Sequence, residues 1–232
     1  MTLNFSDLTR RVRAGQKVTA EDISDVLTAS AAATFALMEF AAELRQQHFG
    51  TLMTVTNLPG VAADVKAGVR LEITAPLDPT TLVTLLIDEG ETRKALELDF
   101  VAGDSALLPM EALRIIAAAR IADPARSLHL GSSREATLRS LQPLAVGAID
   151  SLVLNDSLEE PRLVFEDLKL IVGAGLTIEG AGERDLVAEY VDYLSQHGVA
   201  GAETYAQIAL SGSDKTGGCG GNCACGSGGC GS

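Results

Sequence analysis

The sequence predicts an α/β fold built from parallel βα units and followed by a flexible tail. Short apolar stretches, such as residues 127–130 and 151–154, alternate with helical patterns through the second half of the chain. Hydrophobic residues make up 47% of the 232 residues, which is enough for a sizeable core. All four cysteines, in contrast, lie close to the end of the chain, in a stretch rich in glycine and serine.

Residues 1–50 are expected to form a set of N-terminal helices. Thr19 is a suitable helix cap, and Glu21 and Asp22 follow it as an acidic first turn. A second helical pattern runs over residues 31–48, and Gly50 is placed to end it.

Residues 51–100 are expected to form strands. Residues 51–56 and 69–74 have the composition and alternation of strands, and residues 96–100 alternate in the same way. Residues 82–88 fit either a strand or a helix, and residues 89–92 could close a hairpin. The sequence therefore predicts a small antiparallel β insert in this part of a domain spanning residues 51–210.

After residue 100, strand patterns alternate with helix patterns. Pro109 suits the start of a helix that should end before Pro124. Residues 132–135 read SSRE, a capping-box pattern that opens another helix. His129, between Leu128 and Leu130 on a short strand, should face opposite those two leucines.

Residues 211–232 form a third segment with almost no apolar side chains. Such a segment cannot offset its ordering entropy by burial, so we expect a disordered tail that orders only around a metal, a cluster or a partner.

Charge and composition exclude several classes of partner. The formal net charge is −13, and an acidic surface repels nucleic-acid phosphates. No apolar run approaches the roughly 20 residues of a membrane span, and no signal-peptide core is present. We therefore expect a cytoplasmic protein that binds neither nucleic acid nor membranes.

Several short segments, taken in order, resemble the motifs of one known protein family. LRQQHFG at residues 44–50 is similar to the family's L-R-x-x-H-F-G helix ending. ARIADP at 119–124 and LHLGSSRE at 128–135 resemble its A-R-I-x-x-P and L-S-A-G-R-E patterns. AVGAIDSLVLN at 145–155 and LIVGAGL at 170–176 resemble its late strand and closing helix. In this order the segments resemble the biotin synthase family of radical SAM proteins. The resemblance implies a partial TIM-type barrel made of late βα units.

In that family the arginine of the G-R-E turn lies at the barrel mouth and binds an auxiliary [2Fe–2S] cluster. The resemblance places Arg134 at this position, with His129 close enough to line the mouth, so both are candidate cofactor-binding residues. The alternative for Arg134 is a surface ion pair or a role in holding the helix start, and the alternative for His129 is an ordinary strand histidine. A separate enzyme using Arg134, His129 and Asp156 would require these three to share one pocket.

The chain also departs from the family. Radical SAM enzymes hold a [4Fe–4S] cluster with C-x3-C-x2-C after the first strand, but the corresponding residues 56–63 contain no cysteine. The middle strands of the barrel also have no counterpart. The sequence therefore does not predict SAM binding, and it favours a non-catalytic protein.

The four cysteines are candidate metal ligands, because four thiolates can hold zinc or an Fe–S cluster. They are Cys219, Cys223, Cys225 and Cys230. The leading hypothesis is a biotin-synthase-like accessory protein whose tail binds a cluster or metal, or handles sulfur, for a radical SAM or other sulfur-handling enzyme. A homodimer is also considered. The alternatives are a ribosomal natural-product precursor with a modified Cys/Ser/Gly core and the separate enzyme described above.

Overall fold

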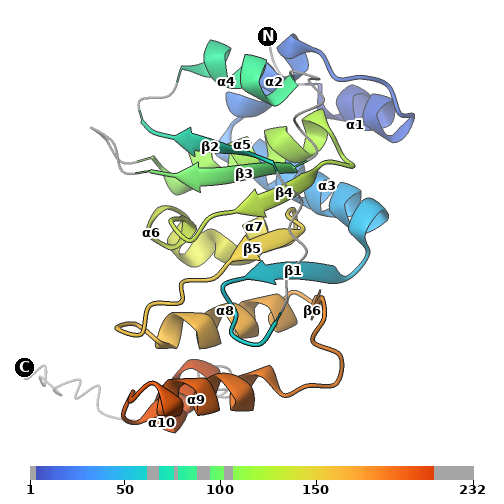
Figure 1. The fold of residues 1–232 in the computed structure, drawn as a ribbon. Coiled ribbons are helices and arrows are strands. Elements are labelled where there is room, and N and C mark those ends of the chain that lie inside the picture. The colour runs from blue at the N-terminus through green and yellow to red at the C-terminus, as the bar shows by residue number, and fades with distance from the viewer. Residues whose placement is uncertain (1–3, 62–67, 76–77, 88–94, 102–106, 212–232) are drawn as a thin grey trace, which may run out of the picture.

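A computed structural model describes residues 4–61, 68–75, 78–87, 95–101 and 107–211. Its centre is a parallel sheet, seen face-on in Figure 1. Six strands follow the order β2-β3-β4-β5-β1-β6, and each neighbouring pair is parallel. The strands are β1 (Leu52–Thr56), β2 (Val69–Ile73), β3 (Ala95–Phe100), β4 (Ser127–Leu130), β5 (Ser151–Val153) and β6 (Thr177–Ile178).

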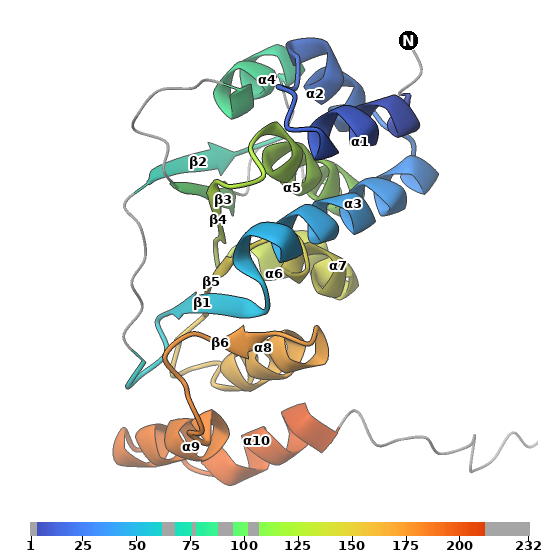
Figure 2. The same ribbon diagram turned by 90° about the vertical axis from the view of Figure 1, so that its right-hand side faces the viewer.

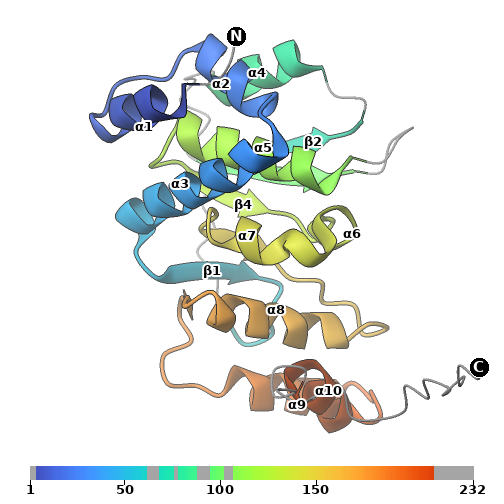
Figure 3. The same cartoon turned by 180° about the vertical axis from the view of Figure 1, so that it is seen from behind.

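The helices that alternate with these strands lie on one face of the sheet, as Figure 2 shows from the side and Figure 3 from behind. They are α3 (Ala31–Phe49), α5 (Pro109–Ala122), α6 (Arg134–Leu138), α7 (Gln142–Val146) and α8 (Arg162–Gly173). A short 3₁₀ helix, η1 (Arg139–Leu141), joins α6 to α7.

The remaining helices lie near the two edges of the sheet. They are α1 (Phe5–Arg13), α2 (Ala20–Leu27) and α4 (Pro79–Ile87) beyond β2, and α9 (Leu186–Gln196) and α10 (Ala202–Ser211) beyond β6 (Figure 1). The N-terminal helices join the helix layer, because α2 and α3 both pack against α5. No helix in the described part of the chain is long and apolar enough to cross a membrane.

The strand order is that of a partial TIM-type barrel. Strands β2 to β5 are neighbours in chain order with helices on one side, as consecutive right-handed crossovers produce. The last of them, β5, pairs with β1 through the register Thr54 to Ser151 and Thr56 to Val153. In a closed barrel the last strand also meets the first, so β5 and β1 reproduce the closing pair, and β6 lies on the far side of β1.

The predicted antiparallel insert is wrong. Residues 79–87 form helix α4, and this helix makes β2 and β3 a parallel pair joined by a crossover. Asp78 begins the helix by accepting hydrogen bonds from the backbone N–H groups of Thr80 and Thr81. The apolar, β-branched composition of this segment is equally compatible with a strand and a helix.

Several predicted helix ends are confirmed, and the capping box predicted at residues 132–135 is wrong. Thr19 and Asp22 form a reciprocal capping box, and Gly50 ends α3 with a φ of 59°. Ser133 precedes α6 without capping it. Its hydroxyl is used elsewhere, since it accepts the backbone N–H of Phe100 and donates to Asp99 on β3.

The core lies between the sheet and the helix layer. Met53, Val55, Leu98, Leu130 and Leu152 are buried on the helix-facing side of the strands. These apolar side chains alternate along each strand with residues that face the other way. The opposite face of the sheet therefore carries different chemistry.

Candidate functional site

The sheet face opposite the helices carries a row of polar side chains that crosses five strands and ends at the residue after the sixth. No helix in the described part of the chain covers this face, as Figures 1 and 2 show. Parallel sheets normally have both faces covered, so a polar, helix-free face is a candidate binding surface. We call these residues the polar row; they are Arg70, Glu97, His129, Ser151, Thr54 and, just past β6, Glu179.

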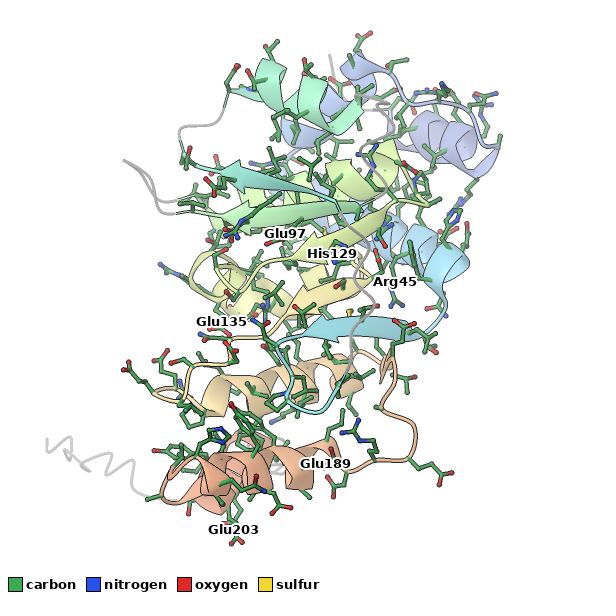
Figure 4. All side chains as sticks on the ribbon, in the orientation of Figure 1. Arg45, Glu97, His129, Glu135, Glu189 and Glu203 are labelled. Atoms are coloured by element: carbon green, nitrogen blue, oxygen red, sulfur yellow. The ribbon has the colours of Figure 1, made fainter. Side chains whose placement is uncertain are left out.

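Strand register places these residues side by side. Glu97 is paired with Arg70 on one side and with His129 on the other. His129 is paired in turn with Ser151, which is opposite Thr54. Figure 4 shows Glu97 and His129 next to each other near the middle of the sheet. The Thr54 hydroxyl donates a 2.7 Å hydrogen bond to Glu179 Oε2.

A cavity of about 330 Å³ lies over the amino-terminal part of this face. Helix α3 contributes His48 to its wall. The other polar lining residues are Thr54, Ser127, His129, Asp150 and Glu179. Ligand sites are usually concave and start at about this size.

Two buried arginines fix the strand ends beneath the cavity. Arg120 of α5 donates to Asp150 Oδ1 at 2.7 Å and to the carbonyls of Ala148 and Arg126 at 2.9 and 2.7 Å. Arg45 of α3, labelled in Figure 4, donates to the Ile149 carbonyl at 2.9 Å. Burial lowers the pKa of both guanidinium groups, but arginine keeps its charge in proteins.

The carboxyl ends of the strands hold a second buried ion pair. Arg134 donates to Asp167 Oδ2 of α8 at 2.5 Å and to the Val153 carbonyl at 2.6 Å. Arg134 thereby ties β5 to α6 and α8. Beside it, burial raises the pKa of Glu135, and the neighbouring Asp167 charge adds to that rise.

Asp99 forms a further polar cluster at the same end of β3. Its carboxylate accepts hydrogen bonds from Ser133 and from Arg70 of the polar row. A glycine is needed beside it, because a Cβ on Gly131 would come within 2.7 Å of Asp99 Oδ1.

Some of the residues singled out from sequence lie together and others do not. His129 faces opposite Leu128 and Leu130, as predicted, and lines the cavity with His48. Arg134 is fully buried and Asp156 is exposed, and neither lines this cavity. The three candidates for a separate enzyme therefore do not converge there. Cofactor binding by Arg134 and His129 stays a prediction.

The four cysteines lie outside the described residues. Among the residues that are described, no group of three or more His, Cys, Asp or Glu side chains is arranged to hold a metal. The described part of the barrel therefore does not fit a cluster held by thiolates.

Sequence reasoning missed several residues of the polar row. Glu97 is one of two acidic residues that alternate with leucines in β3, which is a detectable signal for a polar face. Ser151 and Glu179 gave no such signal, because their position depends on register between strands far apart in the chain.

Comparison with known proteins places this arrangement in a family context. The family described as "Biotin and Thiamin Synthesis associated domain" matches residues 93–177. Residues 93–177 form a biotin-synthase-family region. It contains β3, β4 and β5 with the helices that follow them, and therefore Arg120, Arg134, His129 and Ser151.

Individual biotin synthases match in the same way. The biotin synthase of Kocuria rhizophila is 41% identical over 83 residues, covering 35% of this chain and 18% of that protein. Biotin synthase 2 of Frankia casuarinae is 41% identical over 75 residues, covering 32% and 21%. The biotin synthase of Streptomyces avermitilis is 35% identical over 122 residues, covering 52% and 28%. The matched part thus spans 18% to 28% of these relatives' length.

Proposed function

We propose that this chain is a non-catalytic, biotin-synthase-like accessory protein whose cysteine tail binds an Fe–S cluster or another metal, or handles sulfur, for a partner enzyme. One observation carries the proposal. The chain has the late βα units and a first strand paired with them, but residues 57–63 after that strand contain no cysteine, whereas all four cysteines lie at 219–230.

The composition of the tail supports metal or cluster binding. Four thiolates can complete a tetrahedral zinc site or hold an Fe–S cluster. Glycines between Cys219 and Cys230 allow the tight backbone path that such closely spaced ligands require. A cytoplasmic location belongs to the same proposal, because thiols remain reduced there and stay available for metals.

The polar row supports the part of the proposal that concerns a partner enzyme. A parallel sheet with one face free of helices in the described part of the chain offers a surface that a second protein can use. The partner that this chemistry suits is a radical SAM enzyme or another enzyme that handles Fe–S clusters or sulfur.

Anaerobic purification of the full chain tests the proposal, with iron, acid-labile sulfide, zinc and intact mass measured on one sample. Iron and sulfide in fixed proportion to protein, at the unmodified mass, would support cluster binding. Zinc alone would make the tail a zinc site. A metal-free protein with mass deficits of about 18 or 20 units per modified Ser or Cys would overturn the proposal in favour of a natural-product precursor (these are the masses of water and of water plus two hydrogens).

A further inference from the structure

The 330 Å³ cavity has a hydrogen-bonding character that its residue types alone do not reveal. Thr54 donates its hydroxyl hydrogen to Glu179, and Ser127 donates its own to Asp150 Oδ2 at 2.9 Å. An ionised carboxylate has no hydrogen to give, so the direction of both bonds is fixed. The free positions on these four side chains are therefore lone pairs that can only accept.

A buried hydroxyl on the same face adds an unused group. Ser151 lies between His129 and Thr54 in the polar row, and both of these line the cavity. Its side chain is fully buried, and its Oγ makes no hydrogen bond within the described structure. A buried polar atom without a hydrogen bond is costly unless a bound molecule satisfies it.

Charge in the cavity is also unbalanced. Asp150 is neutralised by the buried Arg120. Glu179, in contrast, has no ion pair among the described residues. One uncompensated carboxylate, together with several acceptors, favours a cation that carries several N–H donors.

Two apolar side chains indicate that this cation is organic. Phe49 and the half-exposed Leu52 complete the wall of the cavity. An inorganic ion would need neither this apolar wall nor this volume. We propose that the cavity binds a small primary amine, with its ammonium group on Glu179, Thr54 and Ser127 and its carbon stem against Phe49 and Leu52.

Amide chemical-shift titration of the full ¹⁵N-labelled chain with n-butylammonium chloride tests the proposal. At neutral pH an alkylamine is protonated, because its pKa is close to that of lysine. We expect saturable shifts of the Leu52, Thr54 and Ser127 amides at millimolar concentrations, since so small a probe binds weakly. Sodium butyrate and n-butanol, at matched ionic strength, should leave these amides unshifted.

Two variants locate the ammonium. Glu179→Gln should weaken n-butylammonium binding about tenfold or more, because a charge-assisted hydrogen bond is lost. Glu203→Gln, on the exposed surface of α10, is the matched control and should leave binding unchanged.

Three results would overturn the proposal. One is the absence of saturable shifts at about 100 mM n-butylammonium. Another is equal binding by the Glu179→Gln variant. The third is saturation of the same amides by calcium chloride, which would make the cavity an inorganic cation site. None of these results bears on metal binding by the cysteines, so this proposal and the proposed function can fail separately.

Discussion

The side chain of Arg120 holds together the chain segments that lead into β4 and β5. Its guanidinium is 1% exposed and bonds Asp150 together with three backbone carbonyls. A buried pair of this kind contributes little net stability compared with apolar residues, but the loss of one partner leaves a buried charge without compensation.

We therefore predict that Arg120→Met lowers the free energy of unfolding by about 3–5 kcal/mol, measured by urea denaturation. The double variant Arg120→Met/Asp150→Asn should cost clearly less than the sum of the two single variants, because it removes both charges. Strictly additive costs would show that the two side chains are not coupled and would contradict this description of the strand ends.

Glu135 gives a prediction that depends on pH. Its pKa is raised by burial and by the Asp167 charge, so the ionised form is disfavoured in the folded state. The folded state then binds its proton more tightly than the unfolded chain does. The stabilising contribution of this proton is complete below the ordinary glutamate pKa and is lost as pH rises through the raised pKa.

Glu135→Gln mimics the protonated form at every pH. It should raise the unfolding temperature at pH 7 by on the order of 2 °C, and this gain should disappear near pH 4, where wild-type Glu135 is itself protonated. Thermal unfolding at the two pH values measures the difference, with the exposed Glu183→Gln as control. A gain that is independent of pH would rule out ionisation as its cause.

At the scale of elements, α4 decides whether the first half of the sheet is parallel. The helix begins at Asp78, and hydrogen bonds from Thr81 and Thr80 hold the pKa of this carboxyl below its usual range. The contribution of the cap is thus present above the ordinary aspartate pKa and is lost as pH falls through the lowered pKa.

Asp78→Ala should lower the unfolding temperature by about 2–4 °C at pH 7. Asp78→Asn, which keeps one accepting oxygen for a backbone N–H group, should lower it less. Differential scanning calorimetry distinguishes the two. Equal losses in both variants would show that the charge matters more than the cap.

Elements differ in how far their local sequence determines them. Thr19, Gly50 and Pro109 carry local signals, and the structure confirms the helix ends that they predict. Residues 82–88 could not be assigned to a strand or a helix, because an apolar, β-branched run fits both until tertiary packing selects one. Ser133 looked like a cap, but its hydroxyl bonds to β3, which no local pattern can reveal.

At the scale of the whole molecule, the biotin-synthase-like region was predictable because short motifs over residues 119–176 keep the family's order. The pairing of β5 with β1 and the polar row were not predictable. Both depend on the strand register between segments that are far apart in sequence, and amino-acid composition does not determine that register.

We propose that the folded part of the chain is independent of the cysteine tail and of any metal that the tail binds. The hydrophobic core of the described residues contains no cysteine. Replacement of Cys219, Cys223, Cys225 and Cys230 by serine should therefore leave this core intact. The quadruple variant and the wild type, purified anaerobically in parallel, should therefore share one unfolding temperature.

Metal and sulfide content per chain is then measured on those two samples. We expect stoichiometric metal in the wild type and none in the quadruple variant, at equal stability. Metal retained by the variant, or a wild type that holds no metal, would contradict it.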